Sequence, residues 1–77
     1  MAKEKEIQKE IVEEVGVIST TVGGWRTELN LISWNGGAVK YDIRPWNEDH
    51  AKCGKGITLT SEELFKLKDL LIQKLGR

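Results

Sequence analysis

Two segments in which apolar and polar residues alternate constrain the fold of this 77-residue chain more than any other feature. In residues 25–34 the apolar side is marked by Leu29 and Leu31, and residues 38–46 alternate in the same way. A period of two residues predicts strands with one buried face and one wetter face. Residues 35–37 are Asn-Gly-Gly, which tolerate positive φ, so we expect a hairpin turn between the two strands.

Two further strands are expected on either side of this hairpin. The segment 11–22 is rich in β-branched residues, which favour a strand, and Gly16 within it indicates a bulge or a bend. A short fourth strand follows the polar loop 47–55. The predicted strands therefore span residues 11–22, 25–34, 38–46 and 56–60.

A helix is predicted at the C-terminal end of the chain. Thr60 followed by Glu63 is a capping-box pattern, which places the helix at residues 61–75. Its apolar positions form a wide arc: Leu64, Phe65, Leu67, Leu70, Leu71, Ile72 and Leu75. This arc is wider than packing against one small sheet requires. We therefore expect the helix to cover its own sheet and also to contact a second copy of the chain.

The short length limits the stability that one chain can reach. Below roughly 80 residues, a single core rarely supplies more than a few kcal/mol. Cys53 is the one cysteine, which excludes an intrachain disulfide, and Cys53 with His50 provides too few ligands for a metal site. Self-association is the remaining source of stability. We expect an α+β homodimer whose single domain, residues 10–77, follows a flexible charged arm at residues 1–9.

The charge balance bears on the partners of the chain. Twelve basic and twelve acidic residues give a net charge of zero, which counts against a uniformly basic binding surface. Residues 15–60 carry five basic and four acidic residues, so a local positive patch is compatible with the total. A lone cysteine, no signal peptide and no apolar run of the roughly 20 residues that span a bilayer predict a cytoplasmic protein without a membrane partner.

The tryptophans and basic residues supply the candidate binding site. Trp34 and Trp46 alternate with charged residues along the wetter faces, which is typical of a platform that stacks on bases beside phosphate contacts. Arg44 and Lys55 are the leading phosphate-binding candidates. Asp42 is expected to play a structural role, either by pairing with Arg44 or Lys40 or by accepting backbone hydrogen bonds. The predicted nucleic-acid-binding residues are Trp34, Trp46, Arg44, Lys55, Lys40, Arg26, Lys52 and Trp25.

Signals for an enzyme are weak. His50 lies near Asp49 and Cys53, but no third group is placed to orient a Cys–His pair. The tripeptide at residues 54–56, Gly-Lys-Gly, lacks the spacing of a phosphate-binding loop. We therefore expect no catalytic residues, no cofactor and no small-molecule substrate.

The order of motifs in the second half of the chain is similar to that of a known family. It consists of Val-Lys-Tyr-Asp-Ile-Arg at residues 39–44, then Trp46, then Lys-Gly-Ile-Thr-Leu-Thr at residues 55–60 before a Leu-rich helix. It resembles the single-stranded-DNA-binding domain of the transcriptional coactivator positive cofactor four, and most of all the bacterial YdbC-type proteins. The resemblance extends over roughly residues 15–75. It differs in the short Lys/Glu arm and the less basic hairpin turn, which weakens the case for transcriptional coactivation.

The resemblance implies a homodimer in which a curved sheet from each copy forms a channel for an unpaired strand. Trp34 and Trp46 match positions that stack on bases, and Arg44 and Lys55 match positions that hold phosphates. It also implies a bacterial protein that associates with the nucleoid.

The sequence thus favours a protein that binds single-stranded DNA with little sequence specificity in transcription regulation, replication or repair. RNA is an alternative ligand, since stacking and phosphate contacts do not by themselves read the 2′-hydroxyl. The other candidate function is a protein–protein adaptor that uses the same Trp- and Arg-bearing face, because these residue types also mark protein interfaces.

Overall fold

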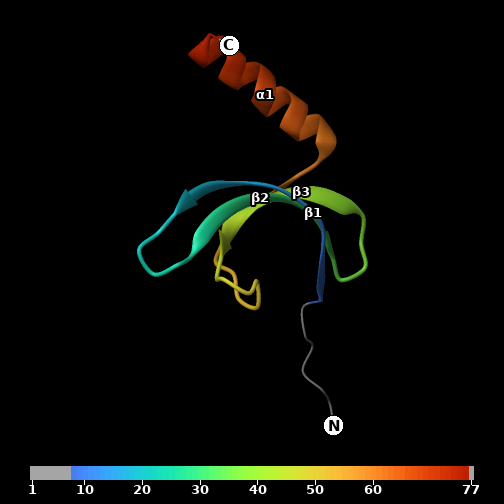
Figure 1. Cartoon of the computed structure of the whole chain (residues 1–77). Helices are drawn as coiled ribbons and strands as arrows, with labels where there is room; N and C mark the ends of the chain where they lie inside the picture. Colours follow the sequence, from blue (N-terminus) through green and yellow to red (C-terminus); the bar gives the residue numbers. More distant parts are fainter. Residues whose placement is uncertain (1–7, 77) are drawn as a thin grey trace.

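Four antiparallel strands followed by one helix make up the computed structural model, which describes residues 8–76 (Figure 1). The strands lie in the order β1-β2-β3-β4, so each pairs with its neighbour along the chain. The elements are β1 (Lys9–Thr20), β2 (Arg26–Trp34), β3 (Val39–Trp46), β4 (Ile57–Leu59) and α1 (Ser61–Leu75). The predicted α+β fold class is confirmed.

The first strand lies two residues closer to the N-terminus than predicted, at Lys9–Thr20 instead of residues 11–22. Lys9 therefore belongs to the sheet, which corrects the boundary of the predicted arm; residues 1–7 of that arm lie outside the described residues. Strands β2, β3 and β4 agree with the predicted ranges to within one residue at each end, and the helix agrees at both ends.

Three irregularities in β1 explain the shape of the sheet. Twelve residues of β1 lie opposite nine residues of β2, and the register shifts at three places. The shifts leave Val12, Val15 and Ile18 as the additional residues of β1, and Gly16, where a bulge was predicted, adjoins one of them. Bulges lengthen and bend the strand that carries them. The sheet accordingly forms an arch with α1 above its convex face and the β3–β4 loop beneath its concave face (Figure 1).

The helix has the predicted start. The Thr60 hydroxyl accepts a hydrogen bond from the Glu63 backbone N–H at 3.1 Å, and the Thr60 N–H donates to the Glu63 carboxylate at 2.9 Å. At the other end Gly76 has φ 80°, a left-handed conformation that favours glycine, and its N–H donates to the Ile72 carbonyl. Each end of α1 is thus capped by groups of the chain itself.

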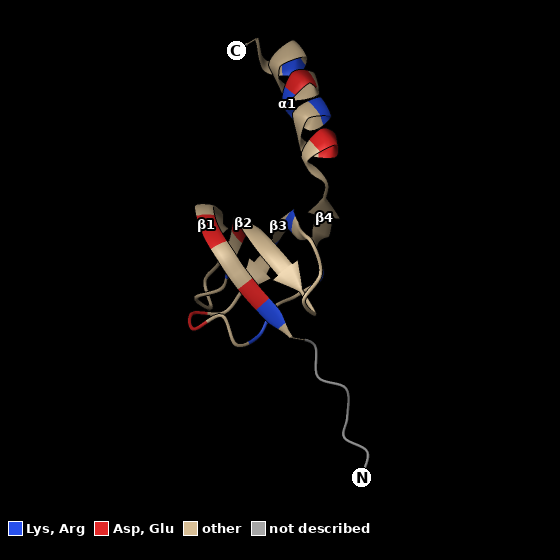
Figure 2. Ribbon diagram, turned by 90° about the vertical axis from the view of Figure 1, so that its right-hand side faces the viewer, with Lys and Arg blue, Asp and Glu red and all other residues tan. Residues whose placement is uncertain are grey.

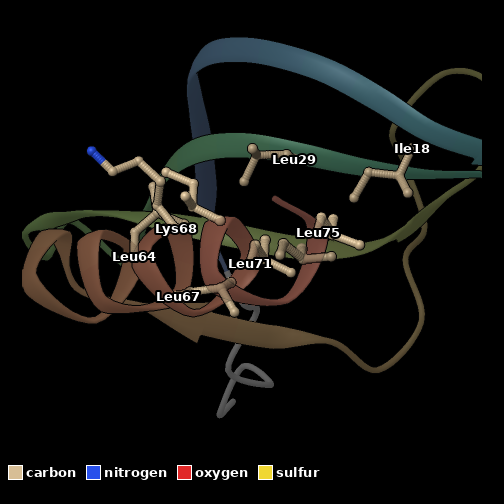
Figure 3. Close-up of a pocket in the computed structure, with 9 residues that line it drawn as sticks. Ile18, Leu29, Leu64, Leu67, Lys68, Leu71 and Leu75 are labelled. Carbon is tan, nitrogen blue, oxygen red and sulfur yellow. The ribbon is translucent and has the colours of Figure 1, made fainter. Parts of the chain in front are cut away.

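The apolar face of α1 is uncovered within one copy of the chain, which corrects the expectation that the helix covers its own sheet. No helix residue is buried, and Figure 2 shows α1 projecting away from the sheet. An open apolar groove runs between the helix and the convex face; Leu71 and Leu75 of α1 line it together with Ile18 and Leu29 of the sheet (Figure 3). Exposed apolar side chains of this extent mark an interaction surface.

Apart from Ser33, the buried side chains lie instead on the concave face. Ile32 and Trp46 are its fully buried apolar residues, and Glu28, Asn30 and Asp42 are buried beside them. Among residues 8–76, no helix has the length and apolar character needed to cross a membrane. In the same described part of the chain, no cluster of three or more His, Cys, Asp or Glu side chains could bind a metal ion.

Candidate nucleic-acid interface

The arch of the sheet brings the two ends of the concave face together. Trp34 ends β2, whereas Trp46 ends β3 opposite Arg26 at the other end of β2. Arg26 and Trp34 are eight positions apart, which corresponds to about 26 Å in a straight strand. The centroids of the Trp34 and Trp46 rings are nevertheless 6.3 Å apart, and the rings are within 10° of parallel. Two tryptophans that are distant along the sheet thus form one aromatic pair.

The exposure of Trp46 differs from the sequence-based prediction. Its face was assigned correctly, but the side chain is fully buried (0 % exposed) rather than open. The His50 ring lies 5.4 Å from it at 52°, and Lys9 Nζ lies 5.7 Å from its centroid. Alternation along a strand shows neither the arch nor the loop that folds beneath it. Trp34 is half-buried, so it is the ring of the pair with an exposed surface.

A buried carboxylate organises this part of the concave face. Asp42 is fully buried and accepts hydrogen bonds from the indole Nε1 of Trp34 at 3.3 Å and from the Thr58 hydroxyl at 3.0 Å. Arg44 donates to both carboxylate oxygens, from Nε at 2.7 Å and from Nη2 at 2.9 Å. Asp42 therefore has the structural role that its place in the Asp-Ile-Arg motif predicted.

Arg44 is held more firmly than an arginine whose guanidinium is free to bind a phosphate. Its Cζ lies 4.8 Å from the Trp34 ring centroid, and its Nη atoms also donate to the Gly54 carbonyl and to Thr58. Burial acts to lower the pKa of Arg44, but its hydrogen bonds to Asp42 and the charge of Asp42 raise that pKa overall. Of the five N–H groups of a guanidinium, four are committed to these partners. Arg44 thus stacks on Trp34 and orients the site.

A second buried carboxylate on the concave face is that of Glu28 on β2. Glu28 accepts hydrogen bonds from Asn30 Nδ2 at 3.0 Å and pairs with His50 Nε2 at 2.8 Å. Burial acts to raise the pKa of Glu28, but these two hydrogen bonds and the charges of His50 and Arg26 lower it overall. An ionised carboxylate only accepts, so His50 carries a proton on Nε2.

Three buried polar atoms of the described chain have no hydrogen-bond partner: Arg26 Nε, Asn30 Oδ1 and Trp46 Nε1. Arg26 Nε is 3.3 Å from a Glu28 oxygen, so the two groups form an ion pair without hydrogen-bond alignment. An unsatisfied buried polar group costs about 1–3 kcal/mol. Such costs are often concentrated at functional sites, and all three atoms lie on the concave face.

The lysines provide the exposed positive charge. Lys40 is exposed on β3, and Lys52 and Lys55 are exposed in the β3–β4 loop. Lys9, beside Trp46, is a fourth exposed lysine that the sequence-based prediction missed because it was assigned to the arm. Trp25 is half-buried immediately before the first residue of β2 and is not part of the stacked pair, and the Thr21 N–H donates to its carbonyl.

The close packing around Gly56 explains why the Lys-Gly-Ile motif has a glycine at this position. A Cβ at this position would collide with the Cβ of Arg44 and the carbonyl oxygen of Ile43. The chain therefore passes close against β3 as it enters β4, and only glycine leaves enough room. This close passage holds the end of the loop beside Arg44, whose guanidinium reaches the Gly54 carbonyl.

Comparison with known proteins agrees with this geometry. Residues 22–70 match the family described as Transcriptional Coactivator p15 (PC4). The matched range contains both tryptophans of the aromatic pair and every predicted site residue, but not β1 or Lys9. An uncharacterized protein of Treponema pallidum (strain Nichols) is 52% identical over 62 residues, which cover 80% of this chain and 73% of the relative.

Proposed function

Because the chain belongs to the PC4 family, we propose that it binds single-stranded DNA with little sequence preference. This family consists of DNA-binding transcriptional coactivators without enzymatic activity, and its members bind single-stranded DNA. The observation that carries the proposal is the aromatic pair of Trp34 and Trp46 on a concave face with exposed lysines around it. The proposed setting is the bacterial cytoplasm, at the nucleoid, in transcription regulation, replication or repair.

Stacking supplies the part of the affinity that does not depend on charge. The exposed part of the Trp34 ring offers a surface for one base, and Arg44 and Asp42 hold that ring in place. Stacking of a base on an aromatic side chain contributes about 1–3 kcal/mol and tolerates any base. RNA bases stack in the same way, so RNA is a second ligand of the proposed site.

Phosphate contacts come from Lys9, Lys40, Lys52 and Lys55, whose side chains are exposed. Arg26 and Arg44, in contrast, pair with the buried carboxylates of Glu28 and Asp42, which fixes the two arginines as parts of the binding surface. The order of importance among the basic residues therefore shifts from Arg44 toward the lysines. A chain with zero net charge can therefore still present these exposed lysines around the concave face.

A homodimer completes the proposed molecule. No residue of α1 is buried in one copy, and its exposed apolar side chains include Phe65, Leu70 and Leu75. A second copy would cover this surface and supply the core that 77 residues lack. A mass measurement by light scattering at micromolar concentration tests this part: twice the chain mass supports it, and the mass of one chain contradicts it.

Salt dependence tests the proposed strand binding. Each phosphate neutralised on a single strand contributes a slope of about −0.7 in log K against log salt, so four lysine contacts predict a slope near −3 for oligo-dT. No measurable binding of oligo-dT at low salt would contradict the proposal. The adaptor function is favoured by the zero net charge of the chain, and it predicts protein binding that changes little with salt.

A further inference from the structure

The geometry points to a lid: we propose that the tip of the β3–β4 loop, residues 47–52, closes over Trp46 and is latched shut by the hydrogen bond between His50 and Glu28. Trp46 can stack on a base only after this loop opens. The inference rests on the proposed strand binding, because it assigns Trp46 to that site. Figure 1 shows the loop beneath the arch, on the side to which Trp46 points.

The contacts of His50 close the lid. Its Nε2 lies 2.8 Å from a Glu28 carboxylate oxygen on β2, and its ring lies against Trp46 of β3. Hydrogen bonds within the loop keep its tip compact: the Asn47 N–H donates to the Lys52 carbonyl, and the His50 N–H donates to the Asn47 carbonyl. The tip can therefore move as one unit when the bond between His50 and Glu28 breaks.

Two features of the closed state carry a free-energy penalty that opening would remove. His50 has φ 60°, a left-handed backbone conformation that is uncommon for residues other than glycine. The indole Nε1 of Trp46 is buried without an acceptor, whereas in an open state it would meet water. The latch offsets these penalties. A tip that is held by the His50–Glu28 bond and by the His50–Trp46 ring contact, and opposed by these two penalties, is the kind of element that switches between two arrangements.

The free protein provides the first test, by acrylamide quenching of tryptophan fluorescence and by hydrogen exchange of the amides of Asn47 and His50. His50→Asn tolerates the left-handed backbone but cannot reach Glu28, and Glu48→Gln is a matched control in the same loop. We expect His50→Asn to quench more strongly and to exchange faster than wild type, and Glu48→Gln to match wild type. The same quenching and exchange in His50→Asn as in wild type would overturn the latch. Hydrogen exchange of wild type needs no variant: if the amides of Asn47 and His50 exchange as slowly as those of the central strands, the lid is overturned even if His50→Asn fails to fold.

Oligo-dT binding provides the second test. His50→Asn should bind oligo-dT more tightly than wild type, because its Trp46 is reached without breaking the latch. If the lid opens as expected but oligo-dT does not bind at low salt, the latch stands and the proposed function is wrong. If His50→Asn and wild type bind oligo-dT equally, strand binding stands and the lid is overturned.

Discussion

The carboxylate of Asp42 holds the guanidinium of Arg44 by two hydrogen bonds, at 2.7 and 2.9 Å, while Asp42 is fully buried. The same carboxylate accepts the indole N–H of Trp34. One buried anion therefore sets the positions of the stacking ring and of the cation that lies 4.8 Å from the centroid of that ring. This arrangement gives the Asp-Ile-Arg motif a physical role: it fixes the binding surface from beneath.

Asp42→Asn should destabilise the protein by about 3 kcal/mol, because removing one partner of a buried ion pair leaves the other charge uncompensated. Urea unfolding measures this change. Asp49→Asn, which alters an exposed carboxylate in the β3–β4 loop, is the control and should change the free energy of unfolding by less than about 0.5 kcal/mol. Equal stability of Asp42→Asn and wild type would show that the buried pair does not organise the face.

Gly56→Ala should destabilise the protein by about 1–3 kcal/mol, since the new Cβ would meet Arg44 and the Ile43 carbonyl and force the chain away from β3. Gly16→Ala is a matched comparison, because no heavy atom lies within 4 Å of a Cβ built there. Thermal unfolding of the two variants should therefore differ clearly. If both variants unfold at the wild-type temperature, the chain does not pass as close to β3 at Gly56 as described.

Glu28 should make the stability of the protein depend on pH in the acid range. Its folded pKa is lowered from the ordinary value of 4.5, so it stabilises the folded state above that value. This contribution is lost as the pH falls through the lower folded pKa. Urea unfolding from about pH 7 to pH 3 should show the loss in wild type, and Glu28→Gln should show a smaller pH dependence. A pH dependence of equal size in both proteins would contradict the assigned pKa shift.

Lys9→Ala should lower the salt slope of oligo-dT binding by about 0.7, the contribution of one phosphate contact. It should also increase the accessibility of Trp46, because Lys9 Nζ lies 5.7 Å from the centroid of that ring. Lys66→Ala, on an exposed position of α1, is the control and should leave both quantities unchanged. If the two variants give the same salt slope, Lys9 does not contact the strand.

Local patterns in the sequence predicted the elements well. The capping box at Thr60 and Glu63 placed the start of α1, and the Asn-Gly-Gly turn placed the β2–β3 hairpin. The bounds of β1 were shifted because its bulges replace the period of two with an interval of three. The β1 residues that follow this interval of three, each opposite a concave-face residue of β2, are Ile11, Glu14, Val17 and Thr20.

The candidate site was predicted in composition but not in exposure. Trp34 and Trp46 lie on the expected face, yet Trp46 is buried because the arch and the loop at His50 close over it. Both are contacts between distant parts of the chain, which alternation along one strand cannot report. Lys9 was missed for a related reason: its position beside Trp46 depends on the same arch.

The most direct measurement of the central claim is a tryptophan fluorescence titration with oligo-dT at low salt, comparing wild type, Trp34→Ala and Trp25→Phe. Trp25 is not part of the stacked pair, and Trp25→Phe keeps an aromatic ring at this position, so this variant should keep the wild-type affinity. Quenching of wild type on addition of oligo-dT, together with a loss of about 1–3 kcal/mol of binding free energy in Trp34→Ala, is the predicted result. Unchanged affinity in Trp34→Ala, or no binding by wild type, would contradict it.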